Sequence, residues 1–154
     1  MERIASFCVD HNKLLGGLYV SRRDKKDGVT VTTFDLRFLP PNRAEVLDTG
    51  TMHTIEHIAA TFLRNSARGG DIIYFGPMGC RTGFYLVMFG DLEPHDVLLL
   101  VKEAFIYVAD FAGNIPGESP SECGNYSDQN LDGAKRAAAD YLAALYRNRT
   151  KYPE

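Results

Sequence analysis

The sequence predicts a single α+β domain, spanning residues 1–154, in which an antiparallel β-sheet packs against helices. The length of 154 residues suits one domain with one core, and no internal repeat or change of composition divides the chain. Two strand-like segments, 14–21 and 29–38, are separated only by a short charged connection, as in a hairpin. Three later segments carry apolar residues at spacings of three and four, which is typical of amphipathic helices.

Charge and composition exclude several classes of function. The formal net charge is -3, and the hydrophobic fraction of 45% is ordinary for a soluble protein. The longest basic run, Arg22 to Lys26, contains an aspartate, and we interpret it together with Asp27 and Gly28 as a charged turn. We therefore expect neither a nucleic-acid partner nor an anionic membrane surface.

The amino terminus and the cysteines indicate the compartment. The first residues lack the apolar stretch of a signal peptide, and no apolar span reaches the length of a membrane helix. The three cysteines are an odd number without a C-x-x-C pair, which favours thiol or metal chemistry over a disulfide framework. We expect a cytoplasmic protein.

The second strand-like segment, 29–38, is rich in Val, Thr and Phe and ends before the Pro40 to Asn42 stretch. Alternation along a strand assigns its residues to two faces. One face holds Thr30, Thr32, Phe34, Leu36 and Phe38, and the other holds Val31, Thr33, Asp35 and Arg37.

Residues 53–57 have the order H-x-x-E-H, which places three reactive side chains within little more than one helical turn. On a helix, His53 and His57 lie one turn apart on the same face, where both imidazoles can bind one metal ion beside Glu56. Residues 48–51 offer the amino-terminal cap of this helix, and the Gly69–Gly70 pair offers its end.

The apolar face of this helix lies opposite the histidines. It is formed by residues at spacings of three and four, namely Met52, Ile55, Ile58, Ala59, Phe62 and Leu63. Two histidines buried in the core therefore fit this pattern poorly. Two solvated surface histidines fit it well, and only a third ligand elsewhere in the chain distinguishes them from a metal site.

The next segments set a cysteine on a turn between two strands. We predict strands at 71–75 and 82–89, joined through a turn at 76–80 that contains two glycines and a proline. Cys80 ends that turn. Such a turn can present a side chain at the edge of a site, and the competing interpretation is a tight connection with Cys80 as a small buried apolar residue.

The carboxy-terminal part is predicted as helix, loop and helix. Helices are expected at 94–111 and 131–147, and the loop at 113–127 is polar and rich in glycine, proline and serine. Cys123 lies within this loop, an unusual position for an apolar core residue, which favours a ligand or reactive role.

Two histidines and one thiolate give three protein ligands and leave a fourth position of a tetrahedral ion open, which is the arrangement of a catalytic metal site. A remaining thiol would then be free for acid-base chemistry with Glu56. Two other functions stay open on these residues: an H-x-x-E-H metallopeptidase, and a binding protein whose loop is stapled by a metal.

The chain resembles the S-ribosylhomocysteine lyase (LuxS) family over nearly its whole length. The resemblance rests on several blocks in the same order. They are Ser6–Phe7, Asp10–His11, Phe34 to Phe38, Pro41–Asn42, His53 to His57, Pro77 to Gly83, Cys123–Gly124 and Gly133 to Lys135.

The resemblance implies a metallohydrolase-like α+β fold and one divalent metal ion per subunit, held by His53, His57 and Cys123. Ferrous iron (Fe2+) is the expected ion, and zinc or cobalt can replace it in isolated protein. It further implies that Cys80 and Glu56 move protons. The substrate contacts it implies are Ser6, His11 and Arg37 at the ribose, and Arg64 at the amino-acid end.

The activity implied by the resemblance is cleavage of S-ribosyl-L-homocysteine to L-homocysteine and 4,5-dihydroxy-2,3-pentanedione, the precursor of autoinducer-2. It also implies a homodimer whose active sites lie at the subunit interface. The chain departs from the family pattern at two positions. Better-known members have an aspartate in place of Tyr74 and a serine in place of Gly76.

Overall fold

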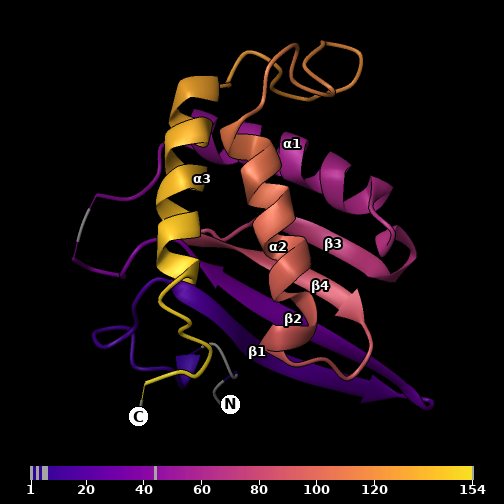
Figure 1. Cartoon of the computed structure of the whole chain (residues 1–154), viewed down its shortest axis with the longest axis vertical. Coiled ribbons are helices and arrows are strands. Elements are labelled where there is room, and N and C mark those ends of the chain that lie inside the picture. The colour runs from indigo at the N-terminus through magenta and orange to yellow at the C-terminus, as the bar shows by residue number, and fades with distance from the viewer. Residues whose placement is uncertain (1, 3, 5–6, 44, 154) are drawn as a thin grey trace.

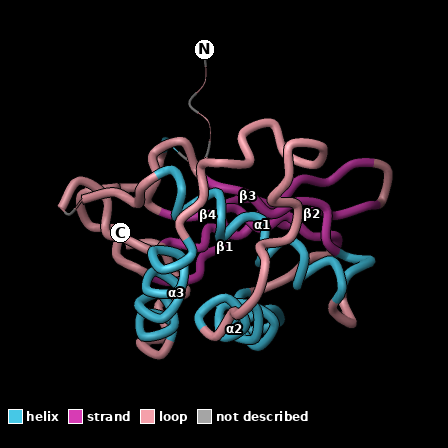
Figure 2. Tube along the Cα trace, turned by 90° about the horizontal axis from the view of Figure 1, so that it is seen from above, coloured by secondary structure: helices cyan, strands magenta, loops and turns pink. Residues whose placement is uncertain are grey.

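The strands form one antiparallel sheet in the order β1-β2-β4-β3, and helices cover only one of its faces (Figures 1 and 2). The computed structural model describes residues 2, 4, 7–43 and 45–153. The strands are β1 (Gly17–Lys26), β2 (Val29–Arg37), β3 (Ile72–Pro77) and β4 (Gly83–Phe89). The helices are α1 (Thr49–Asn65), the short 3-10 helix η2 (Gly69–Asp71), α2 (Pro94–Ala109) and α3 (Leu131–Leu145). The predicted single α+β domain is confirmed.

The first strand is longer than predicted, and the expected charged turn at 22–28 is wrong. β1 continues to Lys26, and only Asp27 and Gly28 form the turn, both with positive φ, at 52° and 80°. The charges are compatible with a strand because β1 lies at the sheet edge, where long polar side chains reach solvent. Arg23 and Lys25 pair with Asp91, at 2.8 and 3.0 Å.

The alternation predicted for β2 divides the sheet into a core face and an open face. Phe34 and Leu36 are buried in the core with apolar residues from all three α-helices. Asp35 and Arg37 point to the opposite face and are also buried, because they pair with each other at 2.6 Å. No described helix covers that second face, and Figure 2 shows α2 and α3 together on the other side.

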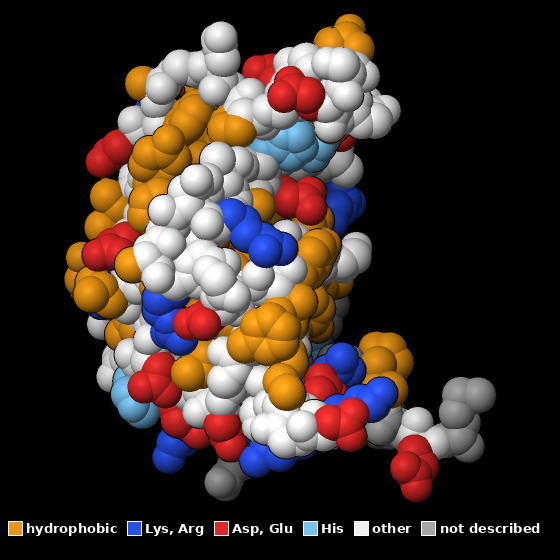
Figure 3. Space-filling view, turned by 90° about the vertical axis from the view of Figure 1, so that its right-hand side faces the viewer, with side chains coloured by type: hydrophobic (Ala, Val, Ile, Leu, Met, Phe, Trp, Pro, Cys, Tyr) orange, Lys and Arg blue, Asp and Glu red, His pale blue; other side chains and the backbone are white. Residues whose placement is uncertain are grey.

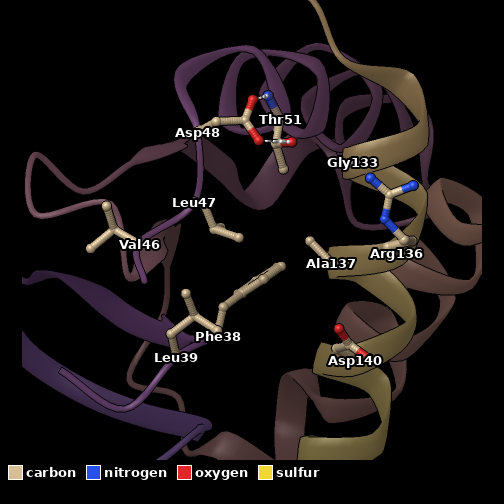
Figure 4. Close-up of a pocket in the computed structure, with 10 residues that line it drawn as sticks. All are labelled: Phe38, Leu39, Val46, Leu47, Asp48, Thr51, Gly133, Arg136, Ala137 and Asp140. Carbon is tan, nitrogen blue, oxygen red and sulfur yellow. Dashed lines mark hydrogen bonds between the residues drawn. The ribbon is translucent and has the colours of Figure 1, made fainter. Parts of the chain in front are cut away.

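α1 begins where Asp48 caps it. The Asp48 carboxylate accepts hydrogen bonds from the Thr51 backbone N–H at 2.8 Å and from the Thr51 hydroxyl at 2.7 Å (Figure 4). The helix ends at Asn65, earlier than the predicted Gly69–Gly70 stop. Ser66 ends it, because its hydroxyl and backbone N–H both bond the Leu63 carbonyl, at 2.7 and 3.2 Å.

The other helices match the prediction except at their last turns, where α2 and α3 each end two residues early. None of the helices in the described part of the chain is long and apolar enough to cross a bilayer. The segment 113–127 is a loop, as predicted, and it lies at one end of the molecule beside α1 (Figure 1).

We predict that Asp48→Ala lowers the free energy of unfolding by about 1 kcal/mol at neutral pH, because α1 loses its cap. Burial raises the pKa of the Asp48 carboxyl, but hydrogen bonds from Thr51 and Asn130 outweigh burial and lower it below the usual value. The ionised cap therefore stabilises the fold above the unfolded-state pKa, and this contribution is lost as the pH falls through the folded-state pKa.

Chemical denaturation at neutral pH and at about pH 3, below the unfolded-state pKa of an aspartate, measures this effect. Asp140→Ala is the matched control, since Asp140 is an exposed helical carboxylate without a hydrogen bond or ion pair to another described residue. Equal losses of stability in the two variants at neutral pH would contradict the stabilising role of Asp48 as the cap of α1.

Candidate metal centre and adjoining cleft

Two histidines and one cysteine converge between α1 and the 113–127 loop. The ligand atoms of His53, His57 and Cys123 all lie within 4.8 Å of one another, and all three side chains are half-buried. The Cys123 sulfur lies 3.3 Å from Nε2 of His53. The predicted pair of helical histidines thus has its third donor, and the interpretation as two merely solvated histidines is not supported.

Hydrogen bonds to the loop orient both imidazoles. Nδ1 of His53 donates to the Asp128 carbonyl at 2.9 Å, and Nδ1 of His57 donates to the Pro116 carbonyl at 2.6 Å. A carbonyl accepts only from a protonated nitrogen, so these contacts assign the proton to Nδ1 and leave the Nε2 lone pairs free for a metal. Both bonds come from the segment that carries Cys123.

Close packing of the loop on α1 requires a glycine at position 117. Gly117 has a φ of 72°, and a Cβ atom there would lie 3.2 Å from Nδ1 of His57. A side chain would therefore strain the backbone and press on the imidazole that Pro116 orients.

Sequence reasoning missed the residues that fasten the other end of the loop. The Thr54 hydroxyl donates to the Gln129 side chain at 2.7 Å and accepts from the Asn130 backbone N–H at 2.9 Å. The Asn130 side chain then caps α3 by accepting from the Gly133 N–H at 2.9 Å. A signal was present: Thr54 lies inside the H-x-x-E-H stretch on the buried side, where a polar side chain needs a partner.

The donor set fits a divalent transition metal. Neutral imidazole nitrogens and a thiolate suit ferrous iron, zinc and cobalt, whereas calcium and magnesium prefer oxygen donors. Three protein donors leave a coordination position for a further group.

A cleft of about 240 Å³ lies beside this centre. It separates α1 from the turn that joins β3 to β4. Its walls are Thr49, Met52, His53 and Glu56 on one side, and Pro77, Met78, Gly79 and Arg81 on the other. On one face of the molecule, Figure 3 shows histidine surface bordered by acidic and basic side chains. The cavity drawn in Figure 4 is a different one, between α1, residues 38–47 and α3, and contains none of the predicted site residues.

Cys80 lies on the turn that forms the far wall of the cleft. The turn is closed by hydrogen bonds from Met78 N–H to the Gly83 carbonyl and from Arg81 N–H to the Met78 carbonyl, at 3.0 and 2.9 Å. Cys80 is exposed, between two residues that line the cleft, and it is not among the clustered metal donors. The interpretation of Cys80 as a buried apolar residue is therefore wrong.

The surroundings of Cys80 favour its thiolate form. Partial burial raises the pKa of the thiol, but hydrogen bonds from Thr82 and the positive charge of Arg37 outweigh burial and lower it below the usual value. The sulfur lies 3.1 Å from the Thr82 hydroxyl and 3.8 Å from Nη1 of Arg37. The positive charge that favours this thiolate comes from the guanidinium of Arg37.

The described members of the predicted substrate-contact set lie in two different places. His11 is half-buried and lines a small cavity together with Asp35 and Arg37 on the open face of the sheet. Arg64 is exposed and donates to the Ile73 carbonyl at 2.8 Å. Ser6 lies outside the described residues.

The two departures from the family pattern are structurally coupled. Tyr74 and Gly76 lie on the open face of β3, and the Tyr74 ring folds over Gly76 so that any side chain at position 76 would collide with the hydroxyl. Burial and the negative charge of Glu56 raise the pKa of Tyr74, so its hydroxyl stays protonated. An aromatic residue at 74 thus requires glycine at 76 in this conformation.

Comparison with known proteins gives a consistent result. The family model described as S-Ribosylhomocysteinase (LuxS) matches residues 4–152. An S-ribosylhomocysteine lyase of Desulfotalea psychrophila is 54% identical over 149 residues, covering 96% of this chain and 94% of the relative. One of Phocaeicola vulgatus is 51% identical, covering 98% and 94%. One of Clostridium acetobutylicum is 48% identical over the full length of both chains.

We predict that Cys123→Ala loses most of the bound metal, because it removes one of three converging donors. The affinity should fall by more than the roughly 100-fold that a change in the outer shell of a metal site can cause. Elemental analysis of the purified variant, after dialysis against a weak chelator, measures the loss.

Cys8→Ala is the control for thiol removal, since Cys8 is exposed and its sulfur has one hydrogen-bond partner among the described residues, the Ile4 carbonyl at 3.6 Å. It should retain its metal. A Cys123→Ala protein with one tightly held ion per chain would disprove the ligand assignment.

Proposed function

The chain belongs to the S-ribosylhomocysteinase (LuxS) family, and from that premise we propose that it is a carbon-sulfur lyase. Its substrate is S-ribosyl-L-homocysteine, and its products are L-homocysteine and 4,5-dihydroxy-2,3-pentanedione, the precursor of autoinducer-2. The observation that carries the proposal is the Cys80 thiol, which belongs to the turn across the cleft from Glu56 and has a lowered pKa without being one of the clustered candidate donors. A peptidase has no use for such a thiol, and neither it nor a metal-stapled binding protein is supported by the relatives.

We assign one divalent ion per subunit to His53, His57 and Cys123, with ferrous iron as the native metal. When bound there, the ion supplies Lewis acidity toward oxygens of the open-chain sugar, which acidifies the neighbouring C–H bonds. Backbone carbonyls engage Nδ1 of both half-buried imidazoles, which supports binding of the ion through Nε2.

Proton transfers by the chain's own residues then move the sugar carbonyl toward the thioether. The Cys80 thiolate takes a proton from the carbon beside the carbonyl, and a proton returned to the former carbonyl carbon completes each of two aldose-ketose steps. Glu56 moves the protons of the oxygens from the opposite wall of the cleft. Once the carbonyl is beta to the sulfur, removal of the intervening proton breaks the carbon-sulfur bond. The bonding electrons leave with homocysteine.

The remaining residues are proposed to bind the substrate. We assign Ser6, His11 and Arg37 to the ribose and Arg64 to the amino-acid end. Arg64 suits a carboxylate because its guanidinium is exposed and spends only one hydrogen bond on the backbone.

The proposed assembly is a homodimer in the cytoplasm, with active sites at the subunit interface. The open face of the sheet supports the dimer, since half-buried Tyr85 and Val87 and exposed Tyr74 and Phe89 project from it without a covering helix. Three free thiols suit a reducing compartment.

We predict that the iron-loaded protein releases free thiol from S-ribosylhomocysteine and that Cys80→Ala reduces turnover by about 100- to 10,000-fold, the usual contribution of a general acid-base group. A chromogenic disulfide follows the thiol. The wild-type rate should fall as the pH drops through the lowered pKa of Cys80, because the thiolate is the base.

Two measurements accompany this assay. Metal content of Cys80→Ala should be unchanged, and its stability should stay within about 0.5 kcal/mol of wild type, as for an exposed substitution. Release of amines from peptides without release of thiol would refute the proposed lyase activity. Near-normal turnover in Cys80→Ala would refute only the proposed role of the Cys80 thiol.

We predict that the protein sediments as a dimer and that Val87→Asp, which puts a charge on the open face of β4, produces an inactive monomer. Leu99→Asp is the matched control, because Leu99 is 69% exposed on α2, away from that face. Analytical ultracentrifugation measures the oligomeric state of each variant, and thermal unfolding checks that each variant is folded. A fully active monomer at assay concentration would exclude shared active sites.

A further inference from the structure

We propose that Tyr152, in the carboxy-terminal tail, is a positioning residue for Cys80. Its hydroxyl fixes the Asp35 carboxylate, and Asp35 in turn fixes the Arg37 guanidinium against the Cys80 sulfur. The inference rests on the proposed role of Cys80 in proton transfer and extends the machinery of that thiol to a segment remote from it in sequence.

The tail is held where this role requires. The Arg149 carbonyl accepts from the Leu18 N–H at 3.0 Å, which fastens the tail to the start of β1. The Tyr152 ring then stacks on Tyr19, with centroids 4.8 Å apart and planes 15° from parallel. In this position the Tyr152 hydroxyl donates to Oδ2 of Asp35 at 2.9 Å.

Asp35 and Arg37 form the centre of the network. Both side chains are only 3% exposed, so each charge depends on its protein partners. One edge of the guanidinium binds Asp35 through Nε at 3.1 Å and Nη2 at 2.6 Å. The remaining nitrogen, Nη1, donates to the Thr82 hydroxyl at 2.6 Å and lies 3.8 Å from the Cys80 sulfur.

The charged and titratable groups around this network define the effect of Tyr152. Around the Arg37 guanidinium they are Asp35 on β2, Tyr19 on β1, Tyr85 on β4, and His11 and Tyr152 from the terminal segments. Arg81 precedes Thr82 in the turn that carries Cys80. Burial and the charge of Asp35 raise the pKa of Tyr152, so its hydroxyl remains a donor. Arg37 is the group whose positive charge acts on the Cys80 thiolate.

Loss of the Tyr152 hydroxyl should shift the pKa of Cys80 in one direction. Asp35 would lose a donor on Oδ2, and its charge would act more strongly on Arg37, drawing the guanidinium toward the carboxylate and away from Cys80. The positive potential at the sulfur falls. The pKa of Cys80 therefore rises, and the thiolate fraction at a given lower pH decreases.

The test is Tyr152→Phe in the metal-loaded protein, which keeps the ring stack and removes one oxygen. Alkylation of Cys80 by iodoacetamide, followed across pH by peptide mass spectrometry, reports the thiolate directly and needs no turnover. We expect the pKa of Cys80 to rise by about 0.5 to 1, equivalent to a roughly 3- to 10-fold slower alkylation below that pKa. The acidic limb of kcat/KM should move by the same amount.

Tyr19→Phe is the matched control, because its hydroxyl belongs to the same ring stack but donates to the Leu15 carbonyl at 2.9 Å. It should leave the pKa of Cys80 unchanged, and metal content and thermal midpoint exclude general loosening in either variant. An unmoved alkylation profile in Tyr152→Phe overturns the inference, as does an equal shift in Tyr19→Phe. Neither result bears on the proposed lyase activity, which is refuted separately if the wild-type protein releases no thiol from S-ribosylhomocysteine.

Discussion

The metal centre depends on the attachment of one irregular loop to α1. Cys123 lies in a segment without helix or strand, so neither a helix nor a sheet sets its position. His53 and His57 hold that segment by donating from Nδ1 to its carbonyls, and the same bonds direct their Nε2 atoms toward the Cys123 sulfur. Each imidazole therefore holds the loop through one ring nitrogen and leaves the other ring nitrogen available to the candidate metal site. Thr54 fastens the far end of the loop.

The surroundings of Cys80 have a separate structural origin. Burial of Arg37 on the sheet is tolerable because Asp35 pairs with it, and the unpaired end of the guanidinium then extends to Thr82 and Cys80. The cleft lies between this half and the half built on α1. One half offers two imidazoles and a sulfur as candidate donors, and the other holds a thiol whose pKa is lowered by hydrogen bonds from Thr82 and by the charge of Arg37. Separate origins allow each cysteine its own chemistry.

Local patterns predicted the elements well and the edges of elements poorly. The alternation in β2 and the helical spacing around His53 were correct because in each element the apolar side chains pack on one side against the common core. The charged run at Arg22 was misread as a turn, since charge is compatible with an edge strand and nothing within the run reveals that β1 has a neighbour on only one side. The end of α1 was placed too late because Ser66, not a glycine, caps it.

The sequence by itself determined the candidate donors, the helix that presents two of them, and the membership of a lyase family, because residue type, spacing and overall similarity are properties of the chain. Tertiary structure alone decided how the Cys123 sulfur meets the histidines, how the Tyr74 ring lies over Gly76, and how Tyr152 reaches Asp35. These contacts join residues distant in the chain. Their geometry arises only when a loop, a sheet face and a terminal segment pack together, and no local spacing encodes it.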